Sequence, residues 1–177
     1  MKTRRTNGFT LIELLIVVTL IGVVVAIAVP GLLRARMAGN EASAIASLRA
    51  VIDGQSAYSS SCAAGGYAVA LADLARPAPS ATQGFVSPDL RTDPAVKSGY
   101  TVALFKEPGA VAVGTAAGTC NGSTGTPVTS YETTADPVTA GVTGMRYFAA
   151  DTRGTIFFSN LASFGTAVIP TSATPVQ

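Results

Sequence analysis

The sequence predicts an α+β protein in which a long N-terminal helix, half membrane-spanning and half amphipathic, packs on a small antiparallel β-sheet. An uncharged, mainly aliphatic run covers residues 14–33, and a helix of that length spans about 30 Å, the hydrocarbon thickness of a bilayer. Apolar residues then continue at helical spacing to about residue 59. Beyond residue 60, short β-prone segments alternate with turn-forming residues, as in an antiparallel meander.

The composition excludes several classes of function. The 177 residues include 12 Lys and Arg against 10 Asp and Glu, a net charge of +2, so no basic nucleic-acid-binding face is indicated. The chain has no His and only 2 Cys, which excludes a His-based triad, a His-ligated metal and a Cys₄ zinc site. Phosphate-binding loops and nucleophile elbows are not found either. We therefore expect a non-enzymatic protein with no catalytic residues, no metal and no cofactor.

The residues before the apolar run predict its orientation. Lys2, Arg4 and Arg5 crowd the N-terminus, and basic residues favour the cytoplasmic side of a membrane. The sequence therefore predicts a single-pass segment with a cytoplasmic N-terminus. The same pattern also fits an ordinary secretory signal cut after Ala28, which would release a soluble binding protein that begins at Val29.

Glu13 fits neither a plain anchor nor a plain signal. It lies at the start of the apolar run, where an ionised carboxylate in hydrocarbon costs at least ~2.5 kcal/mol by insertion scales. Such a carboxylate needs a partner or a function, unless it lies among the lipid headgroups in contact with water. Position alone leaves both interpretations open.

The residues Gly8-Phe9-Thr10-Leu11-Ile12-Glu13 resemble the prepilin signature of type IV pilins and type II secretion pseudopilins. That signature is a short basic leader ending in Gly, a Phe at the cleavage point and a Glu as the fifth mature residue. Gly22 and Pro30 also fall where many members of the family carry helix-weakening residues, although an ordinary kinked membrane helix tolerates both. Softer similarities to a subset of pilins cover residues 32–36, 40–45 and 146–151.

The resemblance implies a route of processing and assembly. A prepilin peptidase would cut between Gly8 and Phe9 and methylate the new amine. Subunits would wait in the inner membrane until a cytoplasmic ATPase and a platform protein draw them into a helical filament with identical or related subunits. Glu13 would pair with the Phe9 amine of a neighbour, and an unpaired Glu13 would be penalised, which fixes the register.

The implied function is that of a structural subunit of a type IV pilus, used in adhesion, motility or DNA uptake. The alternative is a pseudopilin of a type II secretion system. The ten acidic residues are scattered, and the lack of a calcium loop disfavours the major pseudopilins, some of which bind calcium near the C-terminus. The filament would be periplasmic or extracellular.

Together, the pattern and the resemblance divide the chain. We expect a leader at 1–8, a transmembrane or filament-core helix at 9–33, an amphipathic helix at 34–60, a connecting loop at 61–97, and a sheet head with a loose C-terminal tail at 98–177. A helical turn is expected near residues 69–74. The apolar stripe of the second helical half consists of Ala38, Ala42, Ile45, Leu48 and Ile52, and the strand candidates are 100–106, 111–114, 128–134, 145–150 and 155–159.

The cysteines Cys62 and Cys120 both fall in the part of the chain that would be exported. Oxidation is expected in that compartment. A bridge between them would close a long loop and contribute roughly 4 kcal/mol by the loop-entropy model. Two free thiols are the alternative.

Overall fold

The computed structural model describes residues 8–166 and 168–176. The basic leader residues Lys2, Arg4 and Arg5 lie outside these residues. The described chain forms two compact units, which divide between Arg36 and Met37. The helix α1 (Leu11–Ser61) begins in the first unit and ends in the second.

The first unit consists of the apolar part of α1 and the residues that precede it. Every described residue up to Arg36 is exposed. Pro30 lies inside the helix, and the chain is helical on both sides of it. Within the described residues, α1 is the one helix that is long and apolar enough to cross a membrane. Such an exposed apolar helix is consistent with single-pass anchoring.

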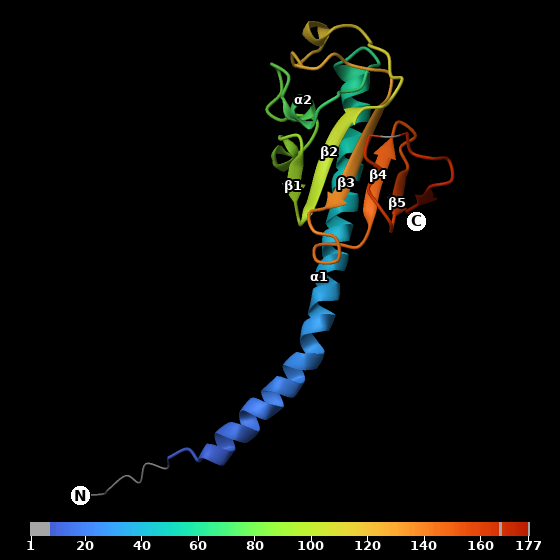
Figure 1. Ribbon diagram of the computed structural model, residues 1–177. Helices are drawn as coiled ribbons and strands as arrows, with labels where there is room; N and C mark the ends of the chain where they lie inside the picture. Colours follow the sequence, from blue (N-terminus) through green and yellow to red (C-terminus); the bar gives the residue numbers. More distant parts are fainter. Residues whose placement is uncertain (1–7, 167, 177) are drawn as a thin grey trace, which may run out of the picture. The chain divides into compact units, whose positions relative to one another are not determined.

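The second unit is an antiparallel sheet with the rest of α1 against one face (Figure 1). The sheet has 6 strands in sequential order, and every neighbouring pair is antiparallel, which confirms the predicted meander and the α+β class. Short helices flank it. The strands are β1 (Ala95–Lys97), β2 (Tyr100–Lys106), β3 (Tyr131–Pro137), β4 (Tyr147–Asp151), β5 (Ile156–Ser159) and β6 (Thr174–Pro175), and the short helices are α2 (Leu71–Ala75), η1 (Pro88–Leu90) and η2 (Ala116–Gly118).

The core lies between α1 and the sheet. Alternate residues of β2 to β5 face the helix, as the period of a β-strand requires: Val102 and Leu104 of β2 are buried in one cluster with Leu48 and Val51 of α1. A smaller cluster on the other face joins Ala149 and Phe157 to Ile169 of the C-terminal tail. The tail is therefore partly packed, and the expectation of a wholly loose tail was wrong.

The buried face of α1 differs from the predicted apolar stripe. Ala38 and Ala42 are exposed and Ile45 and Ile52 are half-buried, so only Leu48 of the stripe is fully buried. The prediction was wrong because it counted apolar residues alone, whereas this face includes polar side chains with partners in the head. The buried residues of the helix are Glu41, Ala44, Ser47, Leu48, Val51, Gly54, Gln55 and Tyr58.

The strand predictions were partly correct. Strand β2 has the predicted bounds, whereas β3 begins and ends later than expected. Residues 111–114 form no strand, because Ala112 makes only an isolated bridge to Val128. The edge strands β1 and β6 were not predicted, since each is too short for an alternating pattern.

Glu41 fastens the helix to the connection between β3 and β4. Its Oε1 accepts bonds from the backbone nitrogens of Met145 at 2.9 Å and Arg146 at 3.3 Å. Its Oε2 accepts a bond from the Arg146 Nε at 2.8 Å. The Arg146 guanidinium also lies over the Phe148 ring, 5.3 Å from its centroid.

We expect Glu41→Ala to lower the free energy of unfolding by about 2 kcal/mol, because the backbone donors and the guanidinium lose a charged acceptor. Thermal unfolding of the full chain in detergent, followed by circular dichroism, would measure this. Asp53→Ala, which removes an exposed acid from the same helix, is the control and should leave the midpoint unchanged. Equal midpoints for both variants would contradict the role of Glu41.

Candidate functional site

The helix start places Glu13 in a capping box with Thr10. Thr10 precedes the first helical residue, Leu11, and its hydroxyl accepts a bond from the Glu13 backbone nitrogen at 3.3 Å. The Glu13 Oε2 in turn accepts bonds from the Thr10 backbone nitrogen at 2.9 Å and from its hydroxyl at 2.6 Å. Reciprocal bonds of this kind satisfy backbone donors at a helix N-terminus.

This arrangement gives Glu13 a local partner that the sequence analysis missed. The signal was present, because Thr-x-x-Glu before an apolar run is the spacing of a capping box. The nitrogen of Phe9 belongs to the peptide bond with Gly8, and the Glu13 carboxylate binds Thr10. Both bonds use the same oxygen, Oε2. The capping box thus occupies one of the two carboxylate oxygens.

Gly22 and Pro30 both lie within the continuous helix α1. A Cβ atom added at Gly22 would meet no atom within 4 Å, so packing within this chain does not require a glycine there. Gly→Ala at an exposed helical site adds about 1 kcal/mol of helix stability. The presence of Gly22 therefore fits either close packing against another helix or a helix that must loosen, and its helix-weakening role stays a prediction.

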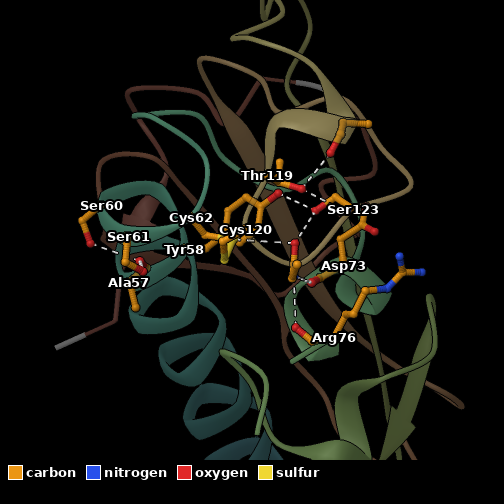
Figure 2. Close-up of a disulfide and its surroundings, with 12 residues drawn as sticks. Ala57, Tyr58, Ser60, Ser61, Cys62, Asp73, Arg76, Thr119, Cys120 and Ser123 are labelled. Atoms are coloured by element: carbon orange, nitrogen blue, oxygen red, sulfur yellow. Dashed lines mark hydrogen bonds between the residues drawn. A yellow bond between two sulfur atoms is a disulfide. The ribbon is translucent and has the colours of Figure 1, made fainter. Parts of the chain in front are cut away.

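Cys62 and Cys120 form a disulfide at the end of α1 (Figure 2), as the sequence analysis expected. The Cys120 backbone nitrogen also donates to the Cys62 carbonyl at 3.0 Å. Beside the bridge, the Tyr58 hydroxyl lies 2.5 Å from the Ser123 hydroxyl, and the Ser123 backbone nitrogen donates to the Thr119 hydroxyl at 2.8 Å.

Asp73 and Asn121 complete the surroundings of the disulfide. The buried Asp73 carboxylate accepts bonds from the backbone nitrogens of Thr124 at 2.7 Å and Gly125 at 3.0 Å. The Asn121 side chain donates to the backbone carbonyls of Asp73 at 2.8 Å and Arg76 at 3.0 Å. These bonds tie the loop that contains Cys120 to α2 and to the residue that follows it (Figure 2). The disulfide is thus part of a buried hydrogen-bonded network that holds this end of the head together.

We expect the double substitution of Cys62 and Cys120 by Ser to lower the free energy of unfolding by about 4 kcal/mol, since the bridge joins residues with a sequence separation of 58 and restricts the unfolded chain. Thermal unfolding with and without reductant would measure the change. Reductant should lower the midpoint of the wild-type chain and leave that of the double variant unaffected. A wild-type unfolding midpoint that does not change when the disulfide is fully reduced would contradict the expectation.

A buried carboxylate lies on the sheet face that points away from α1. Glu132 of β3 is fully buried, and neither of its carboxylate oxygens has a hydrogen-bond partner. Burial, together with the nearby charges of Glu107 and Asp151, raises the pKa of Glu132 to about 8. Burial also raises the pKa of Asp136, whose carboxylate accepts a bond from Ser163. Among the described residues, no group of His, Cys, Asp and Glu is arranged to hold a metal.

Comparison with protein families bears directly on the N-terminal segment. The family model for the prokaryotic N-terminal methylation motif matches residues 3–29. The chain carries the prepilin signature. Gly8, Phe9, Glu13 and Gly22 lie inside the matched residues, and Pro30 directly follows them. A search of the curated proteins and a search of the solved structures each found no match.

The prepilin signature supports a type IV pilin-like or pseudopilin protein. Proteins with this signature are structural subunits that a prepilin peptidase processes and that assemble with membrane machinery. The signature therefore favours the filament interpretation over release by an ordinary secretory signal. Its position also agrees with the structure, since the exposed apolar helix begins within it.

Proposed function

We propose that the chain is a structural subunit of a type IV pilus, cut between Gly8 and Phe9, methylated at Phe9 and assembled from the inner membrane. The observation that carries this proposal is the methylation motif at residues 3–29, which overlaps a fully exposed apolar helix that continues into a folded head. Because this helix is apolar on all sides, lipid covers it before assembly and other subunits cover it in the filament.

In this proposal Phe9 and Glu13 are the assembly residues. Cleavage creates an ammonium at Phe9, and methylation preserves its positive charge. In an environment of low dielectric constant, the Glu13 carboxylate of one subunit and the Phe9 amine of its neighbour each lower the free-energy cost of burying the other's charge. The pair determines the offset between neighbouring subunits more than it stabilises the filament, because a subunit at the wrong offset leaves a buried charge unpaired.

The proposal assigns a role to each part of the chain. Residues 1–8 are the leader and keep the N-terminus in the cytoplasm, residues 9–33 span the inner membrane and later form the filament core, and residues 34–60 carry the head. Residues 61–97 connect the helix to the head at 98–177. The partners are identical or related subunits, the prepilin peptidase, the platform protein and the assembly ATPase, and the final location is a periplasmic or extracellular filament.

Gly22 and Pro30 are the proposed soft points of the membrane segment. Pro30 lacks a backbone N–H and cannot complete the helical hydrogen-bond pattern. Gly22 lowers helix propensity at a site where the chain has room for a larger residue. Loss of helix between them would allow the segment to lengthen in the filament.

Mass spectrometry of the mature N-terminus, isolated from cells with a prepilin peptidase, tests the proposal. The expected N-terminus is N-methyl-Phe9. A mature chain that begins at Val29 would support release by a secretory signal, and one that retains Met1 would overturn processing altogether. Deletion of the peptidase should abolish the cleavage.

The methylation motif is common to pilins and pseudopilins, so a pseudopilin of a type II secretion system is the second candidate. Fibres sheared from the cell surface distinguish the two. A pilus subunit should be recovered as their structural component, whereas a pseudopilin should be missing from them and its deletion should block secretion of folded proteins.

A further inference from the structure

Exposed apolar side chains gather at one end of the sheet. This end holds the β1–β2 turn and the β3–β4 connection, because Tyr100 lies opposite Pro137 (Figure 1). We call it the basal end, and residues 138–146 the basal loop. Val138, Val142 and Met145 of this loop are all exposed. The exposed Leu161 lies near the same end, since it follows β5, whose Ser159 lies opposite Tyr147 at the start of β4.

The basal loop is held in place by bonds to the first part of α1 in the second unit. The Asn40 side chain donates to the Thr143 carbonyl at 2.8 Å, and Glu41 accepts the bonds from Met145 and Arg146. The loop also binds itself, with the Gly141 nitrogen donating to the Gly144 carbonyl at 2.9 Å. Its outward-facing aliphatic side chains are therefore presented by a fixed backbone whose polar groups are largely paired.

The chemistry of the loop suits a surface of low polarity. Residues 138–145 read Val-Thr-Ala-Gly-Val-Thr-Gly-Met and contain no charge. The Thr143 hydroxyl is engaged with the backbone of Thr139. Glu41, which binds the loop backbone, is paired with Arg146. The loop therefore has no negative charge that would repel an anionic headgroup. Transfer of its exposed aliphatic side chains out of water is favourable in free energy.

The sequence places the loop near the bilayer in the anchored chain. The apolar segment ends at Leu33, and the chain from there to Asn40 bridges roughly 10 Å as a helix and at most about 25 Å when fully extended. Arg34 and Arg36 lie in this short stretch, and long basic side chains near the end of a membrane helix reach the headgroup layer. Because this connecting stretch of chain is short, Asn40 and the loop that it binds lie within its reach of the membrane boundary.

We propose that the basal loop is a membrane-contact surface, through which the head of the unassembled subunit rests on the outer face of the bilayer. Val138, Val142 and Met145 enter the interfacial layer, and assembly into a filament removes them from it. The inference rests on the proposed function for the anchoring of the chain, and it adds a contact made by the head itself. The partner is the lipid surface, recognised through aliphatic burial without charge.

The test places an environment-sensitive fluorophore on a single new thiol in the full chain, Val142→Cys. The native cysteines are bridged and do not compete for the label. The matched control is Val111→Cys, since Val111 is 65% exposed against 67% for Val142 and lies beyond the opposite end of the sheet, where Thr129 donates to its carbonyl. Both variants are reconstituted in vesicles of phosphatidylethanolamine and phosphatidylglycerol, with and without brominated acyl chains.

We expect the label at Val142 to shift to shorter wavelength in vesicles and to lose intensity when the lipid is brominated, while the label at Val111 does neither. Equal behaviour of the two labels would overturn the inference. A signal at Val142 that disappears when the protein is diluted in excess lipid would also overturn it, because a second copy of the chain would then cover the loop. Failure of the chain to float with the vesicles would instead overturn the anchoring, and the inference with it.

Discussion

Replacement of Glu13 by alanine leaves cleavage and methylation of Phe9 intact and abolishes the incorporation of the subunit into filaments. This is the expected result if Glu13 compensates the amine of a neighbouring Phe9. Without the carboxylate, every amine brought into the apolar filament core stays unpaired, and an uncompensated buried charge is penalised by several kcal/mol. Mass spectrometry of the membrane fraction and the yield of sheared fibres measure the two steps separately.

The capping box provides the control for this experiment. Thr10→Val removes the hydroxyl that binds Glu13 and weakens the helix start by about 1 kcal/mol, but it keeps the carboxylate. If Glu13 acts in assembly, Thr10→Val still forms filaments and Glu13→Ala does not. Equal loss of filaments in both variants would show that Glu13 acts only by capping its own helix.

We expect the stability of the head to fall as the pH rises from about 5 to about 8, and we expect Glu132→Gln to remove most of this dependence. The pKa of Glu132 is raised from the ordinary value of 4.5 to about 8 in the folded head. Between these values the folded chain holds a proton that the unfolded chain releases, so folding becomes less favourable by at most about 1.4 kcal/mol for each pH unit. Above about pH 8 the contribution of this group no longer changes.

Glu132→Gln keeps the shape of the side chain and removes its charge. We therefore expect this variant to be more stable than the wild type above about pH 8 and little different near pH 5. Urea unfolding at several pH values measures the effect, with the exposed Asp53→Asn as the control. Burial also raises the pKa values of Asp136 and Asp93. The stability of the variant should therefore still fall as the pH rises, but less steeply than that of the wild type. A variant that keeps the full wild-type slope would contradict the assignment to Glu132.

The sequence predicted the parts of the fold that arise from local patterns. The apolar run and helical spacing predicted α1, and the alternating residues of Tyr100–Lys106 predicted β2 with the correct bounds. The helix face that packs on the sheet was misjudged because Glu41 and Gln55 are buried through long-range partners. Gln55 donates to the Ala68 carbonyl at 2.7 Å, a contact that no helical periodicity reveals.

The candidate site also contains local features that the sequence predicts and long-range contacts that it does not. Gly8, Phe9 and Glu13 lie in one short stretch of sequence, so the sequence alone predicts them as site residues, and the matched residues include them; their roles stay a prediction. The Thr10–Glu13 capping box was equally local and could have been found from its spacing. The network around the disulfide could not have been found, because Asp73 and Thr124 are distant in sequence and meet only in the folded chain.

The disulfide divides the head into a covalent ring and a segment outside it. The ring between Cys62 and Cys120 contains α2, β1 and β2, whereas β3 to β6 follow it. A protease that cuts one peptide bond inside the ring leaves both fragments covalently attached to the same molecule, whereas a cut after Cys120 leaves the downstream strands held only by non-covalent contacts such as the pairing of β3 with β2. A single cut within the ring therefore leaves the chain covalently connected, so long as the bridge stays oxidised.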